Sequence, residues 1–290
     1  MANAFETLLP GARDTPARAL TGTVIVVGSA DRIAGARDAL GQLGDVGVRA
    51  ILISEGTRTT PSTSVTENAM AIDGLSPRFL NNAIAALRLS SLPAVVWWRG
   101  GSVEALDDVA DLADRLILDV ESPGVVWRRA AGFFERTALT DLRWTRLTRW
   151  RAALAHLFDL QHVREGAAGV QRLSISASDP DAARLFAGWL RARLRWTNVA
   201  VQLTPAPAGA SGAKSALTHV SLEGPRLSLS LGVKEDSNCL VAAIEGDDGS
   251  ARIVPLADGS LGGLIGEELA VRTRDLAFEQ ALVSALEMPL

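Results

Sequence analysis

The chain has 290 residues, more than one hydrophobic core usually holds, so we expect two domains. Hydrophobic residues make up 48% and charged residues 21% of it, as in ordinary globular proteins, and the net charge of −4 argues against a general nucleic-acid binder. No apolar run approaches the roughly 20 residues of a membrane-spanning helix, and residues 1–20 lack the order of a signal peptide. We therefore expect a cytoplasmic protein that binds neither nucleic acid nor membrane.

The first predicted elements form a strand-helix-strand unit. Residues 1–20 contain two prolines and a glycine without a sustained period, which predicts a loose arm. Apolar β-branched runs follow at 23–27 and 48–54, and between them Ser29 or Asp31 can cap a helix. Such a unit predicts two parallel strands.

The alternation of strands and helices continues to residue 120. The sequence predicts an edge strand at 65–72, a helix at 77–87, a strand at 94–98, a helix at 102–112 and a strand at 115–120. The run 94–98 is apolar without alternation, as in a central strand that is covered on both faces. Together these elements predict a doubly wound, mostly parallel, Rossmann-like sheet.

Ligands and partners of such sheets usually meet the loops at the carboxyl ends of the strands. Trp98 and Arg99 end the predicted central strand and are candidates for binding a partner. Gly28 and Ser29 lead from the first strand into a helix, where an anion could sit, although simple helix capping explains them equally.

Residues 140–158 have the spacing of one amphipathic helix, with Thr140 and Asp141 at its start. The predicted buried stripe contains Leu147, Trp150, Leu154 and Leu157. A second row of arginines, spaced by three residues, contains Arg143, Arg146 and Arg149. Because Trp144 and Trp150 differ by about 120° around a helix, one of these two indoles is a candidate for an outer contact. The same holds for Trp97 and Trp98, which point to opposite faces of a strand.

A domain boundary is expected near Glu165, where a glycine- and alanine-rich stretch breaks the helical pattern. This divides the chain into a domain at 1–165 and a smaller domain at 166–290. The second domain is predicted to contain strands at 173–176 and 198–203, a helix at 179–195, hairpins at 218–231 and 239–256, and two final helices after Ser260 and near Arg274. It is therefore predicted as an α+β unit with an antiparallel sheet, joined through a linker at 205–215.

The motifs that could form a metal, phosphate-binding or catalytic site have simpler explanations. His156, Asp159 and His162 are spaced by three residues, which spreads them around a helix and does not favour a metal site. Residues 209–215 resemble a phosphate loop only loosely, because Ala213 separates the glycine from the lysine. We find no nucleophile elbow, and Cys239, the only cysteine, cannot form a disulfide within the chain. The sequence thus predicts no catalytic residue, metal or cofactor.

The string from Asp141 to Arg151, followed by Phe158 and Asp159, resembles the signature helix of the OpcA family of glucose-6-phosphate dehydrogenase assembly proteins. Further matches follow the family order at 49–53, 92–99, 112–119 and, more weakly, 275–282. Phe278 stands where the family pattern has a tyrosine, and the segment after Asp119 has no match.

The resemblance implies a non-catalytic partner that binds glucose-6-phosphate dehydrogenase in the oxidative pentose phosphate pathway. Such a partner would support the active oligomer or act as an allosteric effector. The candidate partner-binding residues are Trp98, Arg99, Trp144, Arg146, Arg149, Trp150 and Arg151. Two alternatives remain open: an enzyme acting on sugar phosphates through Arg99 and Gly28, and a domain that senses small molecules without catalysis.

Overall fold

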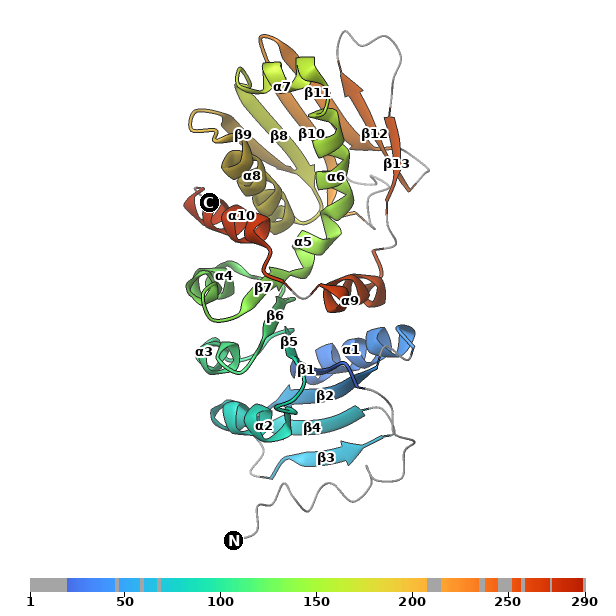
Figure 1. Cartoon of the computed structure of the whole chain (residues 1–290), viewed down its shortest axis with the longest axis vertical. Helices are drawn as coiled ribbons and strands as arrows, with labels where there is room; N and C mark the ends of the chain where they lie inside the picture. Colours follow the sequence, from blue (N-terminus) through green and yellow to red (C-terminus); the bar gives the residue numbers. More distant parts are fainter. Residues whose placement is uncertain are drawn as a thin grey trace. The chain divides into compact units, whose positions relative to one another are not determined.

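The computed structural model describes residues 20–44, 47–57, 60–66, 69–207, 215–234, 238–244, 252–256, 259–271 and 273–288 (Figure 1). The chain divides into two compact units. The first unit contains Met1–Asp141 and Leu261–Asp275, and the second contains Leu142–Ser260 and Leu276–Leu290. The boundary predicted near Glu165 lies inside the second unit. The predicted arm lies outside the described residues except for Leu20.

The first unit is built on a seven-stranded sheet of order β3-β4-β2-β1-β5-β6-β7. Its strands are β1 (Gly22–Gly28), β2 (Val48–Glu55), β3 (Ser62–Val65), β4 (Ala69–Leu75), β5 (Ala94–Trp98), β6 (Arg115–Leu118) and β7 (Ala138–Asp141). All neighbouring strands are parallel except β3 and β4. This confirms the doubly wound, mostly parallel sheet.

Helices cover both faces of this sheet. Its helices are α1 (Ala30–Gln42), α2 (Leu80–Leu87), α3 (Ala105–Ala110), α4 (Gly124–Ala130) and α9 (Leu261–Ala270). Figure 1 shows α2, α3 and α4 on one face and α1 with α9 on the other. Because both faces are covered, consecutive residues of β1 are buried, as the continuous apolar run indicates.

Three elements of the first unit differ from the prediction. The single strand expected at 65–72 is the hairpin of β3 and β4, and neither α4 nor β7 was predicted. Thr140 and Asp141 belong to β7 and do not cap a helix. β7 pairs with β6, and Asp141 Oδ2 accepts a hydrogen bond of 2.8 Å from Trp127 Nε1, so pairing with distant residues outweighs the local capping preference.

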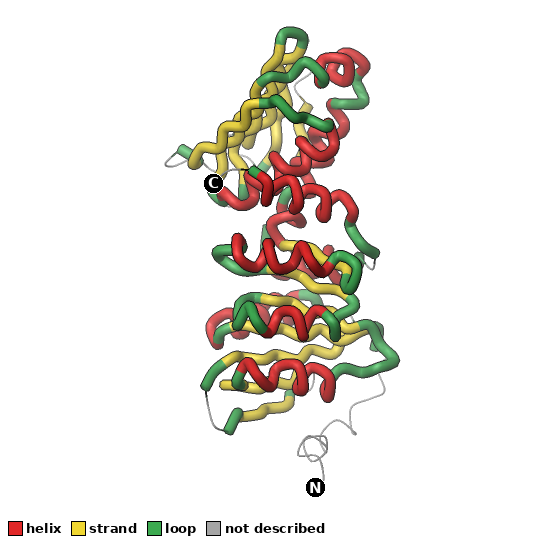
Figure 2. Tube along the Cα trace, turned by 90° about the vertical axis from the view of Figure 1, so that its left-hand side faces the viewer, coloured by secondary structure: helices red, strands yellow, loops and turns green. Residues whose placement is uncertain are grey.

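The second unit contains a six-stranded sheet of order β13-β12-β11-β10-β8-β9. Its strands are β8 (Arg172–Ala177), β9 (Ala200–Pro205), β10 (Leu217–Gly224), β11 (Leu227–Val233), β12 (Cys239–Ile244) and β13 (Arg252–Pro255). Only β8 and β9 pair in parallel, so the predicted α+β unit with an antiparallel sheet is confirmed with one parallel edge. Buried and more exposed residues alternate along β8, and Figure 2 shows the helices on one face of this sheet.

The helices of the second unit are α5 (Leu142–Arg146), α6 (Thr148–Leu157), α7 (Gln161–Ala167), α8 (Pro180–Leu194) and α10 (Leu276–Glu287). The helix expected at 140–158 is thus split at Leu147 into α5 and α6. α8 and α10 pack closely through Gly188, where a Cβ atom would clash with the carbonyl oxygen of Ala281. Of the two final helices, expected together in the second domain, α9 belongs to the first unit. None of the described helices is long and apolar enough to cross a membrane.

Candidate functional site

The carboxyl ends of β1 and β5 meet at the point where the strand order reverses, the usual ligand position in this fold. Arg99 follows β5 directly, and its guanidinium is already engaged. Its Nε donates to Asp119 Oδ2 at 2.8 Å, and its Nη1 donates to the carbonyl oxygen of Arg32 at 2.5 Å. The same guanidinium lies 4.8 Å from the centre of the Trp97 ring.

Two glycines make room for this arginine beside the start of α1. A Cβ atom on Gly28 would lie 3.3 Å from Arg99 Cβ, and one on Gly35 would lie 3.3 Å from Arg99 Nη1. Arg99 is only 9% exposed as a result. The side chain that was predicted to bind a partner or an anion therefore fills the crevice and joins the ends of β5 and β6 to α1.

The start of α1 carries a negative charge of its own. Ser29 Oγ donates to Asp31 Oδ1 at 2.6 Å, and this hydrogen bond holds the pKa of Asp31 below its ordinary value of 3.8. An anion beside Gly28 and Ser29 would approach this ionised carboxylate. The weak anion site at these two residues stays a prediction, and the observed contact does not favour it.

Glu55 is a second carboxylate at this edge of the sheet, at the end of β2. Its Oε2 accepts a hydrogen bond of 3.0 Å from the backbone N–H of Ser102. Burial raises the pKa of Glu55 above its ordinary value of 4.5. Gly101 has a φ angle of +134°, and a Cβ atom there would lie 2.5 Å from Glu55 Oε1, so the turn after β5 fits only around glycine.

The tryptophans of the signature segment in the second unit are buried. Trp144 packs against Phe278 with ring centres 5.8 Å apart, and the guanidinium of Arg151 lies 3.6 Å from the Trp144 ring centre. Trp150 donates from Nε1 to Ser215 Oγ at 3.1 Å. Phe278, which replaces the tyrosine of the family pattern, is thus part of this core.

In each tryptophan pair one indole was a candidate for an outer contact, but all four rings are buried. Trp144 and Trp150 are both buried, because the break at Leu147 separates two short helices and the geometry of one straight helix does not apply. Trp97 and Trp98 are both fully buried as well, because helices cover both faces of their sheet.

The predicted arginine row is exposed only in part. Arg143 is buried and forms an ion pair of 3.0 Å with Asp179, whose other carboxylate oxygen caps α8 by accepting from the backbone N–H of Asp181 and Ala182. Arg146 is half-buried, as is Arg151, whereas Arg149 is exposed. Of the seven candidate partner-binding residues, Arg149 alone offers an exposed side chain.

Asp119 and Asp179 are the residues that sequence reasoning missed. Trp98 and Leu118 are paired positions of neighbouring parallel strands, so Arg99 and Asp119, which follow them, had to lie side by side. This register was a usable signal. No comparable local pattern links Arg143 to Asp179, which are 36 positions apart. The described residues contain no group of three or more His, Cys, Asp or Glu side chains that could hold a metal ion.

One family profile covers most of the second unit and parts of the first. The profile of a family described as the C-terminal domain of the glucose-6-phosphate dehydrogenase subunit matches residues 137–282, half of the chain. The chain belongs to the OpcA family. The resemblance carried by residues 141–151 is thereby confirmed.

Two curated relatives are each named putative OxPP cycle protein OpcA. The relative from Synechocystis sp. is 29% identical over 136 residues, which cover 43% of this chain and 28% of that protein. The relative from Nostoc punctiforme is 28% identical over 132 residues, which cover 42% of this chain and 28% of that protein. The match therefore spans less than a third of either OpcA relative.

Solved structures of other proteins share the fold of this OpcA family member, but their similarity gives no information on its activity. An aldose-aldose oxidoreductase from Caulobacter crescentus has a TM-score of 0.52 and 8% identity, covering 92% of this chain and 94% of that one. A super-repressor mutant of Gal80p from Saccharomyces cerevisiae has a TM-score of 0.51 and 11% identity, covering 92% and 93%. One of these proteins is an oxidoreductase and the other a repressor, so the fold alone assigns no activity.

Proposed function

We propose that this OpcA family member is a non-catalytic partner of glucose-6-phosphate dehydrogenase that supports the active oligomer of that enzyme in the oxidative pentose phosphate pathway. The family match over residues 137–282, described by the name of this dehydrogenase, is the observation that carries the proposal. The two curated relatives are named as OxPP cycle proteins, and their names include no enzymatic activity.

The contacts at the carboxyl edge of the first unit also support a role without catalysis. Arg99 was the anchor of the alternative sugar-phosphate enzyme, and its guanidinium is held by Asp119 and by the carbonyl oxygen of Arg32. A phosphate bound there would have to displace a buried ion pair, which is unfavourable. The enzyme alternative therefore has less support than the partner role.

The exposed edge of α6 is the surface that we propose for this contact. Arg149 is its exposed cation, flanked by half-buried Arg146 and Arg151, and arginine is enriched where proteins bind tightly. The buried residues Trp144 and Trp150 would then shape this edge from below, and Trp98 and Arg99 would hold the first unit together.

Calorimetric titration of the dehydrogenase from the same cell tests the proposed surface. Arg149→Glu should weaken the complex by about tenfold or more, because it reverses the charge at the contact. Arg226→Glu is the matched control, since Arg226 is an exposed arginine in the turn between β10 and β11 of the same unit. If both variants bind the dehydrogenase with equal affinity, the α6 edge is not the surface that contacts this enzyme.

A further inference from the structure

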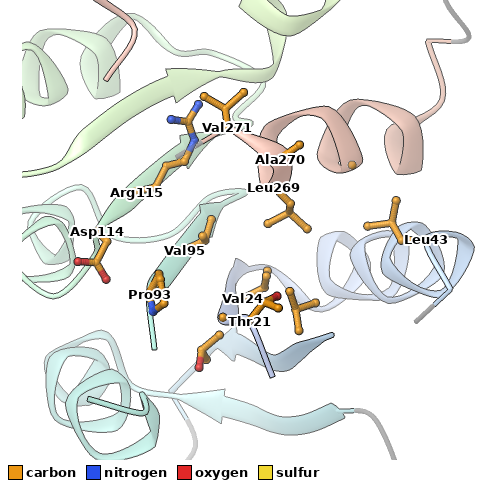
Figure 3. Close-up of a pocket in the computed structure, with 14 residues that line it drawn as sticks. Thr21, Val24, Leu43, Pro93, Val95, Asp114, Arg115, Leu269, Ala270 and Val271 are labelled. Atoms are coloured by element: carbon orange, nitrogen blue, oxygen red, sulfur yellow. The ribbon is translucent and has the colours of Figure 1, made fainter. Parts of the chain in front are cut away.

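The first unit contains a cavity of about 540 Å³ (Figure 3). It lies at the amino ends of the strands, whereas Arg99 follows the carboxyl end of β5. Val24, Val95 and Arg115 occupy paired positions on β1, β5 and β6, so their side chains point to the same face of the sheet. Figure 3 shows this wall facing α9, with Leu269 opposite Val95. The cavity is thus bounded by the amino ends of the strands, the end of α1 and the inner side of α9, and it is open on one side.

The wall of this cavity is mainly aliphatic. Val48, Val95 and Leu269 are half-buried, and Val271 at the rim is 41% exposed. Apolar surface that stays in contact with water costs free energy, and a bound apolar group would remove that contact. A volume of this size falls within the usual range for sites that bind small molecules, which is about 300–1,000 Å³.

Arg115 supplies the polar feature of the wall. Its side chain is buried, its Nη2 forms an ion pair with Glu268 on α9, and its Nη1 donates to the carbonyl oxygen of Thr273 at 3.1 Å. Its Nε is also buried but has no hydrogen-bond partner among the described residues. This nitrogen is shielded from solvent and does not open into the cavity, and the other two nitrogens of the guanidinium are already bonded.

The charges around the cavity decide the class of ligand. Glu268 balances the charge of Arg115, and Asp114, which is exposed, adds a carboxylate whose Oδ2 accepts from the backbone N–H of Ala94 at 2.7 Å. The described lining residues therefore offer no surplus positive charge to a phosphate, sulfonate or carboxylate. We propose that the cavity binds a small, uncharged, apolar molecule. This site does not depend on the proposed binding of the dehydrogenase.

Fluorescence titration with prodan, an uncharged naphthalene fluorophore with one ketone, tests the site on the full chain. We expect saturable binding at one site with a blue shift of the emission. Leu269→Trp places an indole in the cavity and should weaken prodan binding by about tenfold or more. Val283→Trp, at a 44% exposed position of α10 in the other unit, is the matched control and should leave binding unchanged.

The test also uses a second variant that fills the cavity with a larger side chain, and a charged probe. If circular dichroism shows that Leu269→Trp is not folded, Val48→Phe takes its place with the same expected loss of affinity. Anilinonaphthalene sulfonate, an anion of similar size, should bind more weakly than prodan. Absence of saturable prodan binding, prodan affinity that both filling variants leave unchanged, or tighter binding of the sulfonate would overturn the proposal.

Discussion

Trp150 was predicted as a partner contact, and its burial changes what its loss should do. The side chain is 0% exposed, and its Nε1 donates to Ser215 Oγ. Trp150→Ala should lower the free energy of unfolding by about 3–5 kcal/mol, the usual cost of removing a buried tryptophan. Urea unfolding measures this loss. Arg149→Ala, at an exposed position one residue earlier, should stay within about 0.5 kcal/mol of the wild type.

An unchanged urea midpoint for Trp150→Ala would contradict the burial of this ring. A weakened complex with the dehydrogenase is not enough to assign Trp150 to the contact, because loss of the fold has the same effect. Binding experiments with this variant therefore need the unfolding curve beside them.

Glu55 should make the stability of the protein depend on pH. Burial raises its pKa in the folded state above 4.5, so the folded chain holds this proton more tightly than the unfolded chain. The free energy of unfolding that comes from Glu55 therefore falls as the pH rises from about 4.5 through the raised pKa. Glu55→Gln removes this loss and can still accept the hydrogen bond from the Ser102 N–H.

Urea unfolding of the wild type and Glu55→Gln at pH 4 and pH 7 checks the sign. The variant should gain stability relative to the wild type on going from pH 4 to pH 7. A gain of the same size at both pH values, or a larger gain at pH 4, would show that the carboxylate is not penalised by burial.

Residue types and spacing located the important arginines and tryptophans but not their partners. Arg99 was placed correctly at the end of β5, since an apolar run followed by Arg-Gly-Gly marks the end of a strand. Its role was decided by Asp119 and by the carbonyl oxygen of Arg32, which lies 67 positions away. Residue types and their spacing do not show contacts between residues that are this far apart in the chain.

Elements with continuous apolar runs were predictable, and those fixed by distant pairing were not. β1, β2 and β5 follow from their β-branched and aromatic runs, which are typical of strands covered on both faces. β7 has only four residues and exists because β6 lies beside it. Its last two residues, Thr140 and Asp141, also begin the amphipathic pattern of residues 140–158, so local periodicity favoured the wrong element.

Arg115 connects β6 to helix α9 in the first unit. The guanidinium of Arg115 reaches Glu268 within α9 and the carbonyl oxygen of Thr273 just beyond it. Arg115→Met keeps an apolar side chain of similar length but removes both contacts and leaves Glu268 without its arginine. We expect the backbone amides of residues 261–270 to exchange with deuterium at least about tenfold faster in this variant.

Arg136→Met is the control for this exchange measurement. Arg136 pairs with Asp107 and Asp111 on the surface of the same unit, and exposed ion pairs contribute little to stability. Unchanged protection of α9 in Arg115→Met, or equal loss of protection in both variants, would show that the buried pair does not hold this helix.

The two compact units differ in what their residues indicate about function. The first unit has a doubly wound, mostly parallel sheet, but an arginine fills its crevice. The second unit lies inside the region that the OpcA family profile matches, apart from its final residues. Fold class followed from the order of apolar runs. The proposed association with a dehydrogenase came from a family-specific string of residues that elementary periodicity does not explain.

If the chain binds the dehydrogenase as proposed, the complex has a larger mass than either protein alone. Light scattering coupled to size-exclusion chromatography should be measured on the purified chain, on glucose-6-phosphate dehydrogenase from the same cell, and on their mixture. We expect the mixture to elute as a species heavier than the dehydrogenase alone, containing both chains. Two separate peaks with the masses of the isolated proteins, at concentrations well above micromolar, would contradict the proposed function.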